Sequence, residues 1–382
     1  MNLTGGNLAS REEQKSEDRL PRPMSIRRDL AVKENRKTQS APTAAAPVFV
    51  VGMWRSGTSL LYALLNQHPQ IALMYEGDLP LLWRLFRNGK AKRDWLERWE
   101  FWNSALSRHE IDTRALPAEV PSLRAAMESV YRQHAGLAIW GCKSPNYFDC
   151  MTRLAKEFPA GRFIVIYRNP ADICSSVIRA GQKSSWFAKG GMSLRALLGY
   201  REMKREAGRL AAMGAQVYEL QYEDMVRDPA GVLTGICRFL EIPFDPRMVS
   251  LEGADRSAIY DAEHHALVKG KQIVAGGRRE EILPPPLEKK IARYVNYWRE
   301  EFAGRWPAYP GRDADSADSR QAGWIERTGD RLIYRSLRAF DRAVASLYCF
   351  APLGVLRLYR NLKRSRLDLP KPEKAFHSAS AD

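Results

Sequence analysis

Residues 48–69, VFVVGMWRSGTSLLYALLNQHP, carry the strongest structural signal of this chain. The apolar, β-branched run at 48–51 ends at Gly52, which predicts a buried strand that enters a tight turn. The segment GMWRSGTS then fits the phosphate-loop pattern GxxxxGK[ST] except at Thr58, where nucleotide triphosphatases carry lysine. A helix that opens near Thr58 directs its free N–H groups and its positive dipole end at an anion. The stretch therefore predicts a loop that binds a phosphate-like group through its backbone and Arg55.

Composition and charge limit the classes of protein to consider. The chain has 382 residues, of which 45% are hydrophobic and 27% charged, and this is typical of a globular protein with one large domain. Its net charge of +16 is compatible with nucleic acid, an anionic membrane surface, or an anionic substrate and cofactor as partner. Residues 331–382 hold eleven Lys or Arg against four Asp or Glu, so much of the excess lies near the C-terminus. No motif that combines aromatic and basic residues is visible, so we expect no nucleic-acid partner.

Cysteine usage and the N-terminus bear on the compartment. The five cysteines are scattered and never form a CxxC pair, which argues against a disulfide framework or a zinc site and favours a reducing compartment. No apolar run near the N-terminus resembles a signal peptide or a membrane anchor. We expect a cytoplasmic protein that holds no metal.

The order of predicted elements indicates the fold class. Residues 1–46 are polar and charged and are predicted to be a disordered tail. Strands alternate with helices through residues 47–305, which predicts an α/β, three-layer, P-loop-like fold with a central, mostly parallel sheet flanked by helices. Ligands of such folds bind beyond the carboxyl ends of the strands. The predicted strands are residues 48–51, 137–140, 163–167 and 216–222.

Residues 306–382 are predicted to be a basic, helical C-terminal extension. Helical spacing covers 331–366 with an interruption at Pro352, and arginines flank an apolar middle. The uncharged stretch 343–356 is shorter than the roughly 20 residues that span a bilayer. We expect it to lie on an anionic membrane surface, with the protein peripheral on the inner membrane, or to dock on a partner. Packing of the helix on its own domain is the equally weighted alternative.

A second predicted anion loop indicates which kind of ligand the first loop binds. Residues 167–176, YRNPADICSS, again predict a strand, a loop and a helix. Together with the loop at 52–59 this segment resembles the two cofactor motifs of the sulfotransferases that use 3′-phosphoadenosine 5′-phosphosulfate (PAPS). RSGTSLLYALLNQHP is similar to the 5′-phosphosulfate loop, in the arginine version found in carbohydrate and tyrosylprotein sulfotransferases. The resemblance extends over roughly residues 48–300 and implies a PAPS-dependent sulfotransferase, which we expect to be bacterial.

Within this resemblance, the two loops are expected to hold the two anionic ends of PAPS. Arg55 is expected on the sulfonate side, and the N–H groups of the loop on the 5′-phosphate. Arg168 can form a forked contact with the 3′-phosphate, and Ser176 can donate a hydroxyl hydrogen bond to it. Tyr222 is expected near the adenine, as the passage YED implies. The loop residues concerned are Ser56, Gly57, Thr58 and Ser59.

Sulfonate transfer is an in-line displacement, so charge neutralisation and a base for the attacking hydroxyl are the expected parts. Arg55 can neutralise charge on the leaving oxygen, and Lys143, in GCKSPNYF, can do so from the next loop. Within the resemblance Glu76 occupies the place of the catalytic base of tyrosylprotein sulfotransferases, and Asp78 is second choice. A purely structural pairing of Glu76 with a neighbouring arginine stays open. Histidine is the base of small-molecule sulfotransferases, but His109 and His134 lie outside any recognisable motif.

A late segment, HHALVKGKQIVAGGR, resembles the loop that closes over the nucleotide in this family. Within it Lys271 and Arg278 are expected to contact the 3′-phosphate or the sulfonate.

The function expected from these residues is transfer of a sulfonate from PAPS to a hydroxyl of a carbohydrate or a glycolipid, leaving 3′-phosphoadenosine 5′-phosphate (PAP). A protein tyrosine or a small metabolite is the alternative acceptor. A P-loop kinase or nucleotide hydrolase is disfavoured because the chain lacks the loop lysine and an acidic strand end for magnesium. A non-enzymatic protein that binds anionic surfaces is the remaining alternative, supported by the +16 charge.

Overall fold

A computed structural model describes the chain at residues 46–89, 94–117, 119–136, 138–184, 186–260, 283–302 and 320–367, and at 268, 270 and 273. The predicted tail lies outside the described residues except for Ala46. Lys271 and Arg278 also lie outside them.

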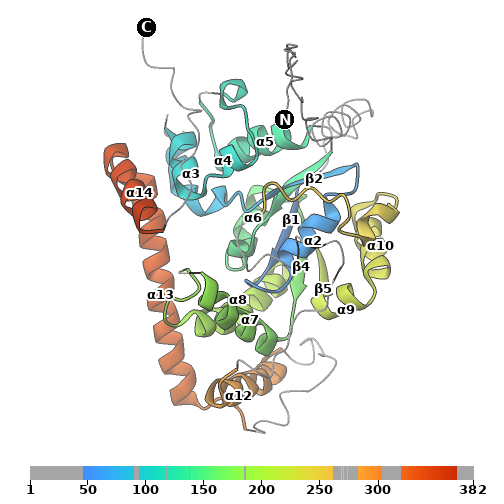
Figure 1. Cartoon of the computed structure of the whole chain (residues 1–382), viewed down its shortest axis with the longest axis vertical. Helices are drawn as coiled ribbons and strands as arrows, with labels where there is room; N and C mark the ends of the chain where they lie inside the picture. The colour runs from blue at the N-terminus through green and yellow to red at the C-terminus, as the bar shows by residue number, and fades with distance from the viewer. Residues whose placement is uncertain are drawn as a thin grey trace, which may run out of the picture. The chain divides into compact units, whose positions relative to one another are not determined.

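The centre of the molecule is a parallel sheet of five strands in the order β2-β3-β1-β4-β5 (Figure 1). The predicted α/β fold with a helix-flanked parallel sheet is confirmed. The middle strand is the apolar run before the first anion loop, which is buried along its whole length. The strands are β1 (Val48–Gly52), β2 (Ile71–Tyr75), β3 (Ile139–Lys143), β4 (Arg162–Tyr167) and β5 (Gln216–Gln221).

Two details of the sheet differ from the sequence prediction. The edge strand β2, IALMY, was missed; five apolar residues are too few to show a period, and parallel pairing with β3 makes this short run a strand. The predicted strand at 137–140 lies further along the chain, at Ile139–Lys143. Lys143 is therefore the last residue of β3 and not a loop residue.

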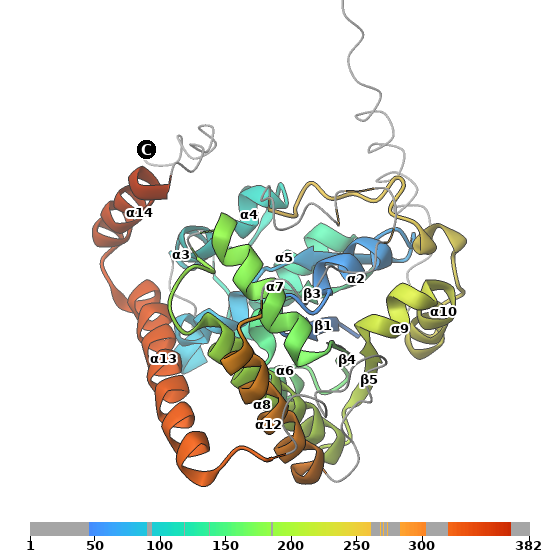
Figure 2. The ribbon, with the colours of Figure 1, turned by 60° about the horizontal axis from the view of Figure 1, so that its bottom comes forward.

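Helices cover both faces of the sheet (Figure 2). Phe49 and Val51 belong to one buried cluster, and Val48 and Val50 to another, because successive side chains of a strand point to opposite faces. The first cluster includes residues of α3 (Trp95–Asn103), α5 (Leu123–Ala135), α6 (Met151–Glu157), α7 (Pro170–Lys183), α8 (Met192–Ala212) and α12 (Pro285–Glu301). The second includes α2 (Thr58–Leu65), α9 (Tyr222–Arg227) and α10 (Pro229–Leu240).

Short elements connect these layers. They are η1 (Leu79–Gly89), α4 (Ala105–Arg108), η2 (Thr113–Ala115), η3 (Pro145–Tyr147) and η4 (Pro246–Val249).

The C-terminal region is helical, as predicted. α13 (Trp324–Phe350) and α14 (Leu353–Leu367) are separated at Ala351 and Pro352, because proline cannot continue a helix through its own position. α13 packs against η1, α3 and α8, and α14 packs against α3. Among the described helices, none combines the length and the apolar character that crossing a bilayer requires.

Candidate active site

The carboxyl ends of four neighbouring strands, β2, β3, β1 and β4, bring the predicted site residues to one edge of the sheet. In the parallel register, Lys143 at the end of β3 lies beside both Tyr75 of β2 and Val50 of β1. On the other side of β1, Gly52 is paired with Ile166 of β4. The loops after β1, β2 and β4 therefore leave the sheet at the same edge, where ligands of open α/β sheets bind.

The first anion loop has the backbone that its glycines predict. Gly57 has φ 96° and immediately precedes α2, whose first residue is Thr58. Arg55 also has a positive φ, 69°, which is strained for a residue with a side chain. The hydroxyl of Ser56 is buried and has no hydrogen-bond partner in the described part of the protein. An anion cradled by the loop would accept from this hydroxyl and from the free N–H groups of the helix.

Alanine at Gly57 is expected to destabilise the protein by about 2–4 kcal/mol and to weaken binding to the loop. A Cβ here would lie 2.4 Å from Cδ2 of Tyr222, and the backbone needs a positive φ. Gly214→Ala is the matched control, because Gly214 has φ 73° but open space around its Cβ position. Urea denaturation should show that the control loses only about 1 kcal/mol of unfolding free energy. Equal losses in the two variants would contradict the close approach of Tyr222.

The second anion loop meets the first directly. Nη1 of Arg168 donates to the carbonyl of Arg55 at 2.9 Å, and Nε of Arg55 donates to the hydroxyl of Ser176 at 3.0 Å. Ser176 belongs to α7, which begins at Pro170 after an Asn169 cap. The guanidinium carbon of Arg168 lies 4.3 Å from the ring centroid of Tyr222. Two motifs more than a hundred residues apart in sequence thus form one cluster.

This cluster is electrostatically suited to an anion. Burial, and secondly the nearby Arg168, lower the pKa of Arg55 to about 10. Two guanidinium groups this close, in a poorly solvated place, are stabilised when a negative charge binds between them. Nε of Arg168 is itself buried without a hydrogen-bond partner among the described residues. The residues present therefore fit the phosphate and phosphosulfate groups of PAPS.

The predicted pair of catalytic side chains is in contact. Nζ of Lys143 lies 2.7 Å from Oε1 of Glu76. The lysine side chain is fully buried, with its Nζ 3.7 Å from the ring centroid of Tyr75, whereas the Glu76 side chain is 17% exposed. Burial lowers the pKa of Lys143, and the charge of Glu76 opposes this shift. Glu76 thus pairs with a lysine, not with the arginine that the structural alternative suggested.

The backbone at Glu76 is held tightly. Its φ is 49°, its N–H donates to the carbonyl of Lys143 at 2.7 Å, and its carbonyl accepts from Nδ2 of Asn103 at 2.7 Å. Arg108 also donates to this carbonyl. A strained conformation that several contacts maintain is typical of functional positions.

Asp78, the second-choice base, lies deeper than Glu76. It is 4% exposed, and its carboxylate accepts hydrogen bonds from the hydroxyl of Ser144 and from Nδ2 of Asn146. Burial, and then the charge of Glu76, raise the pKa of Asp78 to about 6. Because both oxygens are occupied by neighbouring donors, Asp78 is less free than Glu76 to receive a proton from a ligand.

The raised pKa of Asp78 predicts a pH-dependent stability. The protonated form is favoured in the folded state, so the stabilisation is complete below about pH 4 and is lost as the pH rises through about 6. Relative to Asp78→Asn, which does not titrate, the wild type should lose about 2–3 kcal/mol of unfolding free energy between pH 4 and pH 7.5. Urea titrations of both proteins at several pH values measure this difference. A difference of the opposite sign would show that Asp78 is ionised and well stabilised.

The two histidines have packing contacts beside β2. Nε2 of His109 lies 3.0 Å from the backbone N–H of Tyr75, and its ring centroid is 4.8 Å from that of His134. Burial and secondly His134 hold the pKa of His109 well below its usual value, so it is neutral and accepts from Tyr75. It supports the strand end that leads into Glu76.

Two side chains of the site, Tyr75 and Arg108, were not predicted from the sequence. The hydroxyl of Tyr75 lies 2.8 Å from that of Ser59, so Tyr75 joins the first loop to Lys143. Arg108 donates to the carbonyls of Tyr75 and Ala258, and thereby links β2 to a segment far along the chain. The only sequence signal was that Tyr75 directly precedes Glu76.

Comparisons with known proteins identify the family. The model of a family described as "Sulfotransferase family" matches residues 47–246, just over half of the chain. Protein-tyrosine sulfotransferase 1 of Danio rerio is 25% identical over 216 residues, which are 54% of this chain and 56% of that protein. An uncharacterized protein of Aquifex aeolicus (strain VF5) is 25% identical over 221 residues, 53% of this chain but only 26% of its own length.

Solved structures resemble the chain at low sequence identity. The sulfotransferase domain from the curacin biosynthetic pathway has a TM-score of 0.45 and 17% identity, covering 73% of this chain and 98% of that domain. A mouse sulfotransferase complexed with PAP has a TM-score of 0.31 and 15% identity, covering 65% of this chain and 78% of its own. With the family match over residues 47–246 and the paired anion loops, the chain belongs to the sulfotransferase family.

Proposed function

We propose that the protein transfers a sulfonate group from PAPS to a hydroxyl acceptor. The observation that supports this most strongly is the union of two anion loops, in which Arg55 contacts Ser176 and Arg168 contacts Arg55. A single loop would suit any phosphate, whereas two joined loops suit a nucleotide with anionic groups at both ends. The absent loop lysine is consistent with a donor other than ATP.

Each side chain has a role in this proposal. The N–H groups of residues 56–59 and the guanidinium of Arg55 hold the 5′ end, and Arg168 with Ser176 holds the 3′-phosphate. Tyr222, which lies against both Gly57 and Arg168, forms a wall for the nucleotide. The bound nucleotide supplies the sulfonate: its sulfur–oxygen bond to the 5′-phosphate breaks as the bond to the acceptor oxygen forms, and PAP leaves.

Glu76 and Lys143 act on the two oxygens between which the sulfonate moves. Glu76 accepts the proton of the attacking hydroxyl, for which its partly exposed carboxylate is placed. Lys143 and Arg55 supply positive charge where negative charge develops on the leaving oxygen. Because Lys143 is fully buried, its charge is little screened by water.

The acceptor that we propose is a hydroxyl of a carbohydrate or a glycolipid, handled in the cytoplasm. An aromatic surface supports it: Trp186 is 39% exposed and packs edge-on against Trp54 of the first loop, with ring centroids 5.1 Å apart. Nε1 of Trp54 also donates to Asn146, which in turn donates to Asp78. The aromatic surface is thus linked through Asn146 to Asp78, two residues from the proposed base Glu76, and a flat sugar face can pack on it.

A protein tyrosine is the second candidate acceptor. It is favoured by the 25% identity, over 216 residues, to protein-tyrosine sulfotransferase 1 of Danio rerio. A lipid-linked acceptor would require the enzyme to work at a membrane surface.

Calorimetric titration with PAP, and with ATP as control, tests the donor. We expect PAP to bind and ATP with magnesium to bind at least about tenfold more weakly, because ATP lacks the 3′-phosphate that Arg168 receives. Transfer of ³⁵S from labelled PAPS is then followed on polar-lipid extracts, soluble glycans and a tyrosine peptide. A folded protein that fails to bind PAP would overturn the proposal, and label on the peptide alone would replace the carbohydrate acceptor.

A further inference from the structure

The C-terminal helices expose an unusual number of large apolar side chains. Most of the exposed large hydrophobic residues in the described part of the chain lie on α13 and α14 rather than on the sheet domain. The most exposed are Ile325 at 81%, Trp324 at 73%, Phe340 at 67%, Leu358 at 60% and Leu332 at 59%. A patch of this extent on a protein surface marks a site of interaction.

These side chains form an apolar stripe along each of the two helices. Ile325, Leu332, Phe340 and Leu347 follow one another at intervals of seven or eight residues, which places them on one face of α13. On α14, Val355, Leu358, Tyr359 and Leu362 are exposed with the spacing of a single helical face. We call these two sets together the apolar ridge.

The side of α13 that carries the buried Asp330, Tyr348 and Cys349 packs on the rest of the protein. Arg98 donates to the carbonyls of Tyr348 and Ala351 at 2.9 and 2.8 Å. Near the start of the helix Lys290 pairs with Asp330 at 2.6 Å. The packing alternative considered for this helix is therefore correct for its inner face, and that face cannot account for the ridge.

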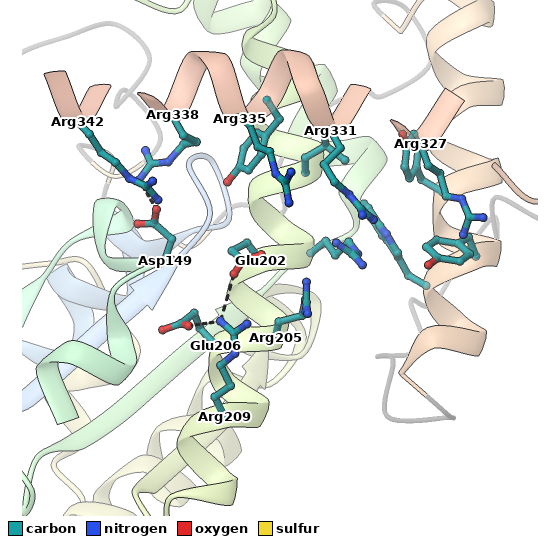
Figure 3. A pocket seen from close by; sticks show the side chains of 16 residues that line it. Asp149, Glu202, Arg205, Glu206, Arg209, Arg327, Arg331, Arg335, Arg338 and Arg342 are labelled. Carbon is teal, nitrogen blue, oxygen red and sulfur yellow. Dashed lines mark hydrogen bonds and ion pairs between the residues drawn. The ribbon is translucent and has the colours of Figure 1, made fainter. Parts of the chain in front are cut away.

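A row of arginines runs beside the ridge. Arg331 and Arg335 extend from α13 toward α8, where Arg205 lies opposite them, and Arg342 lies further along α13 beside Arg338 (Figure 3). They line a cavity of about 570 Å³ whose walls carry eight arginines but only three carboxylates. Among the described residues, Arg205, Arg331, Arg335 and Arg342 form no ion pair, whereas Arg201, Arg209 and Arg338 do. The hydroxyl of Tyr334 in the cavity wall is buried and has no hydrogen-bond partner in the described part of the chain. The cavity is thus suited to groups with negative charge.

The cavity is separate from the catalytic site. It is lined by the C-terminal half of α8, which leads into the first residue of β5. None of the residues proposed to bind PAPS or to act in catalysis lines it.

We propose that α13 and α14 dock the enzyme on an anionic phospholipid surface, with the apolar ridge in the acyl–headgroup boundary and the arginine-lined cavity facing the phosphates. An apolar helix face flanked by arginines is the composition of interfacial membrane helices. The sequence from Ala343 to Leu367 contains no acidic residue, so the last turns of α13 and the whole of α14 are attracted to negatively charged lipid. The docking proposal does not depend on the proposed function. The further conclusion that the acceptor hydroxyl belongs to a lipid-linked molecule does rest on the proposed function.

A second copy of this chain suits the ridge less well. A symmetric dimer through α13 would bring the same arginine rows of two copies together. The acidic residues of α13, Glu326, Asp330 and Asp341, already pair with basic residues of their own chain and therefore do little to offset this repulsion. Anionic lipid neutralises those rows.

Vesicle co-sedimentation of the full-length protein tests the docking. We expect binding to vesicles of phosphatidylcholine with phosphatidylglycerol, much weaker binding to phosphatidylcholine alone, and a decrease with salt. The variant L332S/F340S/L347S should bind roughly tenfold or more weakly, since exposed apolar side chains are what it removes. R331A/R335A/R342A should lose about a hundredfold on anionic vesicles, roughly fivefold for each arginine.

The matched control is K156A/R238A/R247A, which removes three exposed cations away from α13 and should keep most of the binding. Calorimetry with PAP on each protein reports on the catalytic site separately. A protein that binds vesicles but not PAP would contradict the proposed function and leave the docking proposal standing. Equal binding by the wild type and the ridge variant would overturn the docking. So would a wild-type dimer in sedimentation velocity that the ridge variant converts to a monomer.

Discussion

Replacing Arg168 with alanine is expected to weaken PAP binding by about a hundredfold or more. Arg168 joins both anion loops through its contact with the carbonyl of Arg55, and its buried Nε has no hydrogen-bond partner in the described structure. Two charge-assisted hydrogen bonds to a phosphate are worth about 3 kcal/mol or more, which is about two orders of magnitude in the dissociation constant. Calorimetric titration with PAP measures this loss.

Two further variants show whether the loss is specific. Arg168→Lys keeps the charge but not the planar fork, and is expected to recover only part of the affinity. Arg162→Ala removes an arginine at the opposite end of the same strand, where it pairs with Glu241, and should leave PAP binding unchanged. Adenosine 5′-monophosphate, which lacks a 3′-phosphate, should bind the wild type and Arg168→Ala about equally. A hundredfold loss for this ligand too would mean that Arg168 holds the loop and not the phosphate.

Replacing Glu76 with glutamine is expected to lower kcat by about 10²–10⁴ while PAP affinity changes by less than about threefold. Glutamine keeps the size of the side chain but cannot accept a proton. Its position next to Lys143, and away from the contacts between Arg55, Ser176 and Arg168, predicts this separation of catalysis from donor binding. Single-turnover transfer of labelled sulfonate together with calorimetry provides the two measurements.

The ion pair with Lys143 requires a control on this result. Glu76→Gln leaves a buried lysine without its carboxylate, so part of the effect can arise from loss of stability. The double variant Glu76→Gln/Lys143→Met removes the unbalanced charge and should regain stability. Its turnover should stay low, because it also lacks the positive charge that Lys143 supplies to the leaving oxygen. If the double variant regains turnover as well, Glu76 serves only to balance Lys143. If Glu76→Gln reduces affinity and kcat equally, the assignment as base is wrong.

The parts of the fold that could be read from the sequence are those with strong local patterns. β1 is a continuous apolar run ended by glycine, and Gly57 supplies the positive φ that starts α2. Pro352 likewise separates α13 from α14, because it interrupts the helical hydrogen bonds. β2 carries no such pattern. It is five apolar residues long, and its pairing with β3 is a contact between distant parts of the chain.

The candidate site likewise combines features that local sequence determines with contacts that depend on the tertiary structure. The amino-acid sequence by itself determined which residues are available: two anion loops with Arg55 and Arg168, and a carboxylate at Glu76. Such motifs are local, because their backbone conformation depends on neighbouring glycines, prolines and caps. Only the tertiary structure decided that Arg55 meets Ser176, that Glu76 pairs with Lys143 and that Asp78 is buried. These contacts depend on the order in which parallel strands pair, which no single segment encodes. In the same way, the sequence predicted C-terminal helices with an apolar middle flanked by arginines, but packing against α3 and α8 decided which of their faces stays exposed.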